Sequence, residues 1–116
     1  MNKTIGPYTP AVRAGDFIFV SGQLGMLDGS LADGVAAQTT QAVENLAGQL
    51  DAMGATLGDV VKTTCFLADM DAFATFNDAY VVGFGNHRPA RSTIAVRELP
   101  VNGLVEIEAV AFKPVR

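Results

Sequence analysis

The stretch LVEIEAVAFK, residues 104–113, decides the fold class, because it predicts a strand that is apolar on both of its faces. One face holds Val105, Ile107, Ala109 and Ala111, and the other holds Glu106, Glu108, Val110 and Phe112. A face that carries Val110 and Phe112 beside two glutamates is expected to be partly buried. Since helices are expected to cover the first face, we infer that the second packs against another subunit.

The rest of the chain alternates between strand and helix patterns. The expected elements are two strands around a turn at 14–16, a helix over 35–54, a strand within 56–70 that is β-branched over 60–64, a helix over about 72–84 capped by Asp71, and a strand over 90–99. Each helix is expected to turn one apolar face inward, formed in the first by Val35, Thr39, Ala42, Val43, Leu46, Leu50 and Met53, and in the second by Phe73, Phe76, Ala79, Tyr80 and Phe84. An Asp-Gly pair at 28–29 predicts a further turn. The order ββαβαββ over residues 1–116 indicates one α+β domain, with two helices packed on one face of a mixed sheet.

The composition indicates an oligomer and argues against a nucleic-acid partner. Hydrophobic residues make up 49% of the 116 residues and charged residues only 17%, so polar cover is scarce for a chain of this size. The simplest interpretation is that apolar surface is buried against other subunits. The net charge of -4 disfavours nucleic acid, because phosphate binding needs a basic face.

The sequence has too few cysteines and histidines for a disulfide or a zinc site. Cys65 and His87 are the only cysteine and the only histidine, so the chain can form no internal disulfide and no zinc cluster. The sequence therefore predicts no metal. The first ten residues lack the apolar core of a signal peptide, and no apolar run approaches a membrane span. We expect a cytoplasmic protein with no membrane partner.

The stretch HRPARST, residues 87–93, makes Arg91 a candidate anion-binding residue. Pro89 biases Arg88 towards an extended conformation, so Arg91 enters the following strand from a stiffened approach. Its guanidinium is a planar fork that matches a carboxylate. The alternative is a structural salt bridge to one of the 12 acidic residues.

Glu106 is the second candidate, because it lies in the middle of a predicted strand among apolar neighbours. Burial there would raise the pKa of its carboxyl group and let it hold a water molecule. The alternatives are a solvent-facing residue or an ion pair with Lys62 or Arg97. Glu108 has the same pattern.

Other residues are candidates for lining a pocket. Tyr8 follows a Gly-Pro turn, and Ser21 and Gly22 end an apolar strand, where a glycine lets a ligand approach the backbone. The alternatives are a packing aromatic residue and a bulge glycine. On the second predicted helix, Tyr80 is expected to pack, and Asn77 to face either a cleft or solvent.

Six segments of the chain resemble the RidA family, the reactive-intermediate (enamine and imine) deaminases once grouped as YjgF-type proteins. They are IGPYTPAV, FIFVSGQLG, DVVKTTCFLADM, FNDAY, RPARSTIAV and VEIEAVA, in the family's order, and they extend from about Ile5 to Phe112. Each segment alone is a weak signal, but the combination is specific.

The resemblance implies a chorismate-mutase-like fold and a homotrimer, in which three sheets form a central β-barrel with a cleft at each subunit interface. It also implies a hydrolase that acts on C=N bonds and needs no cofactor. The implied substrates are 2-imino acids such as 2-iminobutanoate and 2-iminopropanoate, which arise from enamines such as 2-aminoacrylate. The products are 2-keto acids and ammonia, so the implied role is to remove damaging metabolites.

By position, the resemblance implies that Arg91 binds the substrate carboxylate and that Glu106 positions the attacking water. The implied lining residues are Tyr8, Ser21, Gly22, Asn77, Tyr80 and Thr93. Thr93 stands where many members have a cysteine. We expect this position to act through its backbone amide, because hydrolysis of an imine needs no thiol.

Two other hypotheses remain at this point. A trimer that binds a small carboxylate such as a 2-keto acid, without turnover, would use Arg91 equally well. Ribonuclease activity has also been attached to family members, but the net charge of -4 and the lack of a basic face interleaved with aromatic residues count against it. The sequence does not identify the preferred imino acid.

Overall fold

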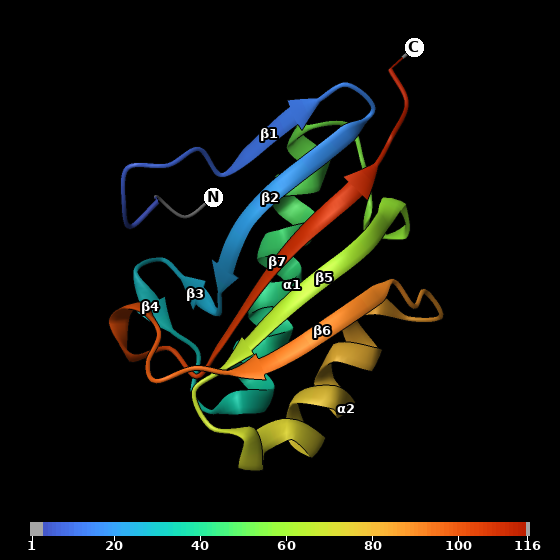
Figure 1. The fold of residues 1–116 in the computed structure, drawn as a ribbon. Helices are drawn as coiled ribbons and strands as arrows, with labels where there is room; N and C mark the ends of the chain where they lie inside the picture. The colour runs from blue at the N-terminus through green and yellow to red at the C-terminus, as the bar shows by residue number, and fades with distance from the viewer. Residues whose placement is uncertain (1–3, 116) are drawn as a thin grey trace.

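Strand β7 is central to the sheet and pairs with a neighbour on each side (Figure 1). The structure is a computed structural model that describes residues 4–115. Its larger sheet has five strands in the order β1-β2-β7-β5-β6. These strands are β1 Ala11–Ala14, β2 Phe17–Leu24, β5 Val60–Leu67, β6 Ala90–Ala95 and β7 Val105–Phe112. The pattern that is apolar on both faces therefore belongs to an inner strand of the sheet.

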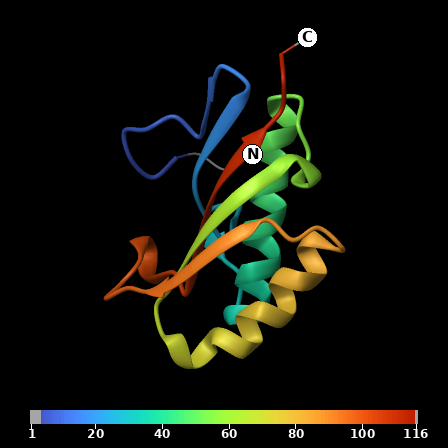
Figure 2. The ribbon, with the colours of Figure 1, turned by 45° about the vertical axis from the view of Figure 1, so that its right-hand side comes forward.

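The sheet is mixed, because β5 and β6 run parallel while the other pairs are antiparallel. A parallel pair needs a crossover connection, and helix α2, Phe73–Phe84, supplies it. Helix α1, Val35–Ala52, packs with α2 on the same face of the sheet (Figures 1 and 2). Three short 3-10 helices are η1 Leu57–Asp59, η2 Met70–Ala72 and η3 Pro100–Asn102. The predicted α+β arrangement is confirmed.

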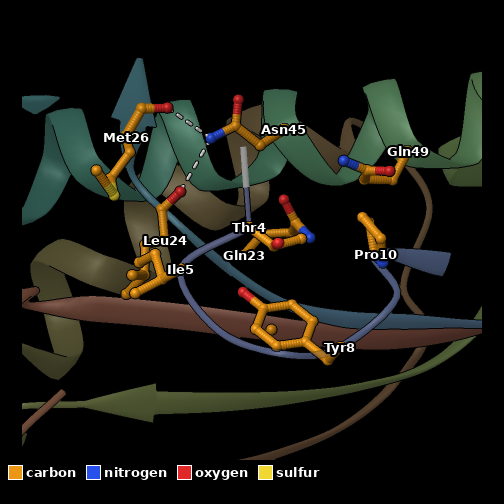
Figure 3. A pocket seen from close by; sticks show the side chains of 10 residues that line it. Thr4, Ile5, Tyr8, Pro10, Gln23, Leu24, Met26, Asn45 and Gln49 are labelled. Atoms are coloured by element: carbon orange, nitrogen blue, oxygen red, sulfur yellow. Dashed lines mark hydrogen bonds between the residues drawn. The ribbon is translucent and has the colours of Figure 1, made fainter. Parts of the chain in front are cut away.

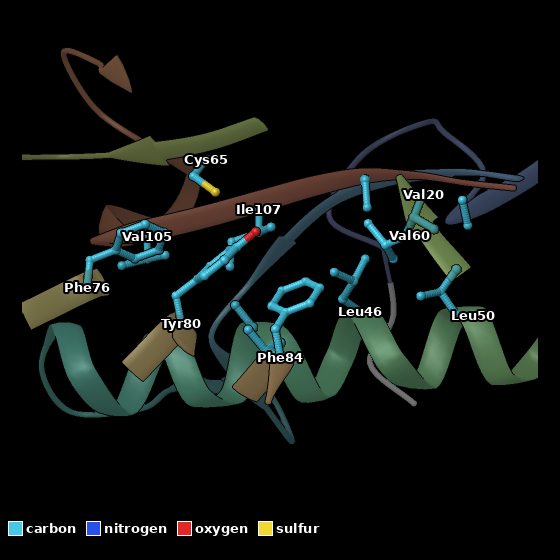
Figure 4. Packing of buried hydrophobic residues seen from close by; sticks show 14 of the residues in the cluster. Val20, Leu46, Leu50, Val60, Cys65, Phe76, Tyr80, Phe84, Val105 and Ile107 are labelled. Atoms are coloured by element: carbon cyan, nitrogen blue, oxygen red, sulfur yellow. The ribbon is translucent and has the colours of Figure 1, made fainter. Parts of the chain in front are cut away.

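The hydrophobic core fills the space between the sheet and the two helices (Figure 4). Ile107 on β7, Cys65 on β5 and Leu46 on α1 have no exposed surface. The buried apolar residues of α1 recur three and four apart, as an amphipathic helix requires, and are Ala42, Val43, Leu46 and Leu50. The predicted inward stripe of α1 is thus confirmed. Within residues 4–115, no helix is long and apolar enough to cross a membrane.

The opposite face of the sheet carries no helix and exposes large apolar side chains. Phe17 and Phe112 pack edge to face across β2 and β7, with ring centroids 5.2 Å apart, and each is 42% exposed. The exposed apolar residues on this face are Val12, Phe17, Phe19, Val61, Ile94 and Phe112. We call this the open face. Its apolar character agrees with the scarcity of polar residues in the composition.

The turn predicted at Asp28 and Gly29 is confirmed as a two-residue hairpin. It joins β3, Met26–Leu27, to β4, Ser30–Leu31. Asp28 has a φ of 55° and Gly29 a φ of 85°, and two central residues with positive φ are what a type I′ hairpin turn needs.

Two predicted boundaries were wrong. Asp71 does not cap α2, because the 3-10 turn η2 precedes the helix, whose N-cap residue is Ala72 without a side-chain hydrogen bond. Instead the Asp71 amide donates a hydrogen bond of 2.9 Å to the carboxylate of Asp69. Strand β6 ends at Ala95, before the predicted end at 99, because the chain leaves the sheet to form η3.

A pair of glycine substitutions tests how tightly β2 is joined to α1. A Cβ atom on Gly25 would overlap the backbone of Gln38, whereas a Cβ on Gly48 in α1 would meet open space. We expect Gly25→Ala to destabilise the protein by about 1–3 kcal/mol through overpacking. We expect Gly48→Ala to stabilise it by about 0.5–1 kcal/mol, because alanine is the better helix former. Urea unfolding of both variants checks this, and a neutral Gly25→Ala would contradict the close approach.

Candidate functional site

A β-bulge brings Ser21 and Gly22 to the side of Glu106. The register between β2 and β7 shifts between Val20 and Gln23, so the two residues between them bulge out of the regular ladder. An open pocket of about 370 Å³ lies here, lined by Ile5, Gly6, Tyr8, Ser21, Gly22, Leu24, Pro100, Glu106 and Glu108. The structure thus brings four predicted site residues together, and we call this pocket the glutamate half-site.

Hydrogen bonds from Ser21 tie the N-terminal segment to the bulge. Its hydroxyl donates to the Thr9 carbonyl at 2.8 Å, and its amide donates to the Pro10 carbonyl at 2.9 Å. The Tyr8 amide donates to Gly6 at 3.0 Å and closes the preceding turn. These bonds place the 45% exposed Tyr8 at the wall of the glutamate half-site.

Tyr8 also borders a smaller pocket of about 40 Å³ on the side of α1 (Figure 3). Across this pocket, the Asn45 side-chain amide donates to the carbonyls of Leu24 and Met26 at 2.9 and 2.8 Å. Because these bonds engage Asn45 with the backbone, we assign this smaller pocket a structural role at the end of β2.

The Glu106 side chain packs directly against Gly22. A Cβ atom at position 22 would overlap the Glu106 carboxylate, so a larger residue there would force that side chain into another rotamer. The alternative predicted for Gly22, a bulge glycine, is confirmed. The group that lies against Gly22 in the structure is the Glu106 side chain, and approach of a ligand stays a prediction.

The Glu106 carboxyl group is partly buried and has a raised pKa. The main cause is desolvation by burial, and the negative charge of Glu108 on the same face of β7 adds to it. Among residues 4–115 no cation forms an ion pair with Glu106, and the Lys62 amine instead donates to the Ser92 hydroxyl at 2.8 Å. Neither Lys62 nor Arg97 is thus its partner within this chain.

Arg91 lies on the other face of the sheet, under helix α2. In the parallel pairing of β5 and β6 it is opposite Thr63, whose side chain is fully buried beneath α2. The guanidinium carbon of Arg91 is 4.9 Å from the centroid of the Tyr80 ring. It is 5.5 Å from the Phe76 ring and 5.7 Å from the Phe73 ring, so all three rings are in cation–π range.

No carboxylate neutralises Arg91 within the described chain. The ion pair among residues 4–115 joins Lys113 to Asp59 at 3.9 Å, and the Arg91 guanidinium donates no hydrogen bond to these residues. The structural salt bridge that was the alternative for Arg91 is therefore absent from this part of the chain. An arginine held only by aromatic rings keeps its N–H groups for another partner.

Two buried polar oxygens accompany Arg91. Asn77 Oδ1 and Thr93 Oγ1 are shielded from solvent and have no hydrogen-bond partner among the described residues. Asn77 is one helical turn after Phe73, and Thr93 is two residues after Arg91 on the same face of β6. They therefore lie with Arg91 between β6 and α2, and we call this group the arginine half-site.

Neighbouring residues with reactive side chains have structural roles. The Tyr80 and Thr63 hydroxyls share a hydrogen bond of 2.7 Å, and burial raises the pKa of Tyr80, so its hydroxyl stays neutral. Burial likewise raises the pKa of the Cys65 thiol to about 11, so this buried residue carries no thiolate at neutral pH. The His87 Nε2 lies 2.6 Å from the Val60 carbonyl. Among residues 4–115, no acidic, histidine and cysteine side chains gather as a metal site.

One copy of the chain does not bring the two half-sites together. Cys65 faces the core, and it is paired with Thr93 on one side and Ile107 on the other. Arg91 and Thr93 therefore share the core face with Ile107, whereas Glu106 lies on the opposite face. The pocket around Glu106 does not include Arg91.

Sequence reasoning did not identify three of the residues around Arg91 as part of a site. They are Phe73, Phe76 and Thr63. Phe73 and Phe76 had been expected to pack inward, which the structure confirms for Phe76, while Phe73 is 39% exposed. Their spacing with Tyr80 along one helix face was the available signal. That this face lies against Arg91 depends on the pairing of β5 with β6 and could not be read locally.

The fold and the two half-sites define an α+β protein with an unpaired arginine and a desolvated glutamate on opposite faces of its sheet. The family model described as Endoribonuclease L-PSP matches residues 1–113. The chain belongs to this family, which includes proteins named RidA, so the resemblance found in the sequence is confirmed.

Relatives in this family carry more than one name. The chain is 40% identical over 114 residues to a 2-iminobutanoate/2-iminopropanoate deaminase of Salmonella typhimurium, covering 94% of this chain and 89% of that protein. It is 43% identical over 114 residues to a RutC family protein of Pyrococcus horikoshii, covering 96% and 90%. The solved structure of RidA from the Antarctic bacterium Psychrobacter sp. is 37% identical with a TM-score of 0.92, covering 95% of this chain and 91% of that one.

The raised pKa of Glu106 predicts a gain of stability when its charge is removed. A carboxyl group whose pKa is raised by folding stabilises the protein below its unfolded pKa, and this contribution is lost as the pH rises through the folded pKa. We therefore expect Glu106→Gln to raise the melting temperature at pH 7 and to lose this advantage at acidic pH. Thermal unfolding across pH checks this, with the exposed Glu44→Gln as control. A lower melting temperature at pH 7 would contradict burial as the dominant effect on the Glu106 carboxyl group.

Proposed function

We propose that this protein hydrolyses 2-imino acids, such as 2-iminobutanoate and 2-iminopropanoate, to 2-keto acids and ammonia. The unpaired guanidinium of Arg91 is the observation that carries the proposal, because it provides a fork for the substrate carboxylate. The name of the Salmonella typhimurium relative supports the reaction class.

We further propose that three copies assemble with their sheets around a central β-barrel, and that each active site lies in a cleft between two copies. The separation of Arg91 from Glu106 within one chain supports this arrangement, since one partner must come from elsewhere. The apolar open face supports it as well, because contact between copies would bury side chains such as Phe17 and Phe112. The arginine half-site of one copy then faces the glutamate half-site of the next.

The proposed chemistry needs positioning rather than a cofactor. Arg91 binds the carboxylate, and Glu106 holds a water molecule against the imine carbon and takes its proton. The water oxygen forms a bond to that carbon while the C=N double bond becomes a single bond, and the nitrogen receives the proton that Glu106 took from the water. The remaining hydroxyl proton then passes to the nitrogen, the C–N bond breaks, the oxygen forms the keto group, and the nitrogen leaves as ammonia. The sum is one imine and one water giving one keto acid and one ammonia.

The remaining site residues are proposed to shape this cleft. Tyr8, Ser21 and Gly22 would line it from the glutamate half-site, and Gly22 fixes where the Glu106 carboxylate lies. Asn77, Tyr80 and Thr93 would line it from the arginine half-site. The reaction requires no thiol, so Thr93 is compatible with it.

An assay of imine release tests the function directly. A threonine dehydratase generates 2-aminocrotonate and its imine, and the appearance of the keto acid is followed with and without this protein. We expect the wild type to accelerate release and Arg91→Ala to lower kcat/KM by about 10²–10³-fold, as for loss of a charged partner in a desolvated site. Arg91→Lys should not restore it, because an ammonium lacks the planar fork. Arg97→Ala, at an exposed arginine, is the control.

The same assay separates turnover from mere binding. If the wild type bound 2-ketobutyrate through Arg91 yet gave no acceleration with several imino acids, the deaminase proposal would fail. A trimer that binds small carboxylates would then be the better description. Failure of both turnover and binding would remove both functions.

Mixing two inactive variants tests the shared active site. Arg91→Ala and Glu106→Gln are each expected to be inactive alone, but trimers refolded from equal amounts of both contain interfaces with one intact Arg91 and one intact Glu106. Random assembly gives about one quarter of the wild-type sites, and we expect that fraction of activity. Absence of any recovery in verified mixed trimers would contradict a site built from two copies.

A further inference from the structure

Arg91 is held in place by aromatic rings rather than by polar bonds. Its guanidinium carbon is within 5.7 Å of three ring centroids, those of Phe73, Phe76 and Tyr80. The side chain forms no ion pair and donates no hydrogen bond within residues 4–115. Contact with these rings is therefore what restricts the orientation of the guanidinium in this chain.

The three rings come from one face of α2, and the inner two pack against each other. Phe76 and Tyr80 have ring centroids 5.5 Å apart, and Tyr80 stacks on Phe84 at 4.6 Å. Phe76 is fully buried, Tyr80 is 3% exposed, and Phe73 is 39% exposed at the outer end. The inner rings thus belong to the core, whereas Phe73 meets solvent.

Tyr80 has a second attachment that fixes its ring above the sheet. Its hydroxyl shares a 2.7 Å hydrogen bond with Thr63, which is fully buried and is the residue opposite Arg91 in the β5–β6 pairing. The pairing of β5 with β6 therefore sets the distance between the Tyr80 ring and the Arg91 guanidinium. A displaced ring would leave Arg91 without its nearest support.

We propose that Phe73, Phe76 and Tyr80, with Thr63 as the anchor of Tyr80, are positioning residues that hold the Arg91 guanidinium with its N–H groups towards the carboxylate of the substrate. This inference rests on the proposed function, because it names how that site recognises its 2-imino acid. Aromatic rings accept no conventional hydrogen bond from a guanidinium, so the N–H groups of Arg91 stay available for the two parallel hydrogen bonds that a carboxylate forms. The helix α2 thereby governs substrate affinity without contacting the reacting carbon.

Phe73 is the residue at which the proposal is most directly tested, because its partial exposure lets it change without opening the core. Phe73→Leu keeps the apolar volume and removes the ring, and Phe73→Tyr keeps the ring. Since the carboxylate has the same charge in the substrate and in the transition state, we expect Phe73→Leu to raise KM roughly two- to fivefold with kcat unchanged. We expect Phe73→Tyr to retain the wild-type KM, and Val82→Ala, at an exposed position of the same helix, to do the same.

The anchor is tested by a pair of variants that separates stability from positioning. Tyr80→Phe leaves the buried Thr63 hydroxyl with only the weak hydrogen bond from the Cys65 thiol at 3.8 Å, so the melting temperature should fall and KM should rise. Adding Thr63→Val removes the unpaired hydroxyl and should recover much of the melting temperature. KM should stay raised, because the ring is still unanchored. Recovery of KM together with stability would show that the hydrogen bond has only a structural role.

A readout that does not depend on activity distinguishes this inference from the function itself. The NMR signals of the Arg91 side chain are expected to carry ring-current shifts that shrink in Phe73→Leu and persist in Phe73→Tyr. Wild-type turnover with equal KM for Phe73→Leu and Phe73→Tyr would overturn the positioning role and leave the proposed function intact. Wild-type protein that shows the ring-current shifts but neither turnover nor binding of 2-ketobutyrate would refute the function, and the substrate role of the rings with it.

Discussion

The alternation of side chains along β-strands is the constraint on which the site depends. Successive residues of β7 point to opposite faces, so Ile107 must enter the core if Glu106 is to reach the open face. The pairing of β7 with β5, and of β5 with β6, then commits Arg91 to the core face as well. A charged residue on that face has to be accommodated, and the aromatic face of α2 does so without a carboxylate. The opposite placement of Arg91 and Glu106 is therefore a direct result of sheet geometry.

The fold was largely predictable because its signals are local. The stripe of α1 and the double-faced apolar pattern of β7 each lie within one segment, and each was confirmed. The site was less predictable, because its geometry depends on which strands pair and in what register. Nothing local shows that Thr63 lies beside Arg91, or that Gly22 lies against Glu106. The residue types at the site were nominated from the sequence, but their division between two faces came only from the three-dimensional structure.

The surroundings of Glu106 and of Arg91 have opposite effects on the charges of the two side chains. The charged form of Glu106 is destabilised by burial and by its neighbour Glu108, which is unfavourable for folding but suits the proposed role of holding and deprotonating water. Arg91 lies over aromatic rings and forms no ion pair among residues 4–115, so its N–H groups are available. In both cases the charged group has no ion-pair partner among the described residues, which is why a ligand is proposed to bind there. The protein thus tolerates unfavourable electrostatics where a ligand is proposed to bind.

The overlap that a Cβ at position 22 would make with Glu106 links the evolutionary fates of two distant positions. While a glutamate occupies position 106, selection for its placement also selects glycine at 22. A lineage that replaced Glu106 by a smaller residue would be released from that requirement, and larger side chains would accumulate at the bulge. Restoring the glutamate first would then place its carboxylate in another rotamer, away from its present position. The β-bulge therefore couples the side chain at position 22 to the orientation of the carboxylate at position 106.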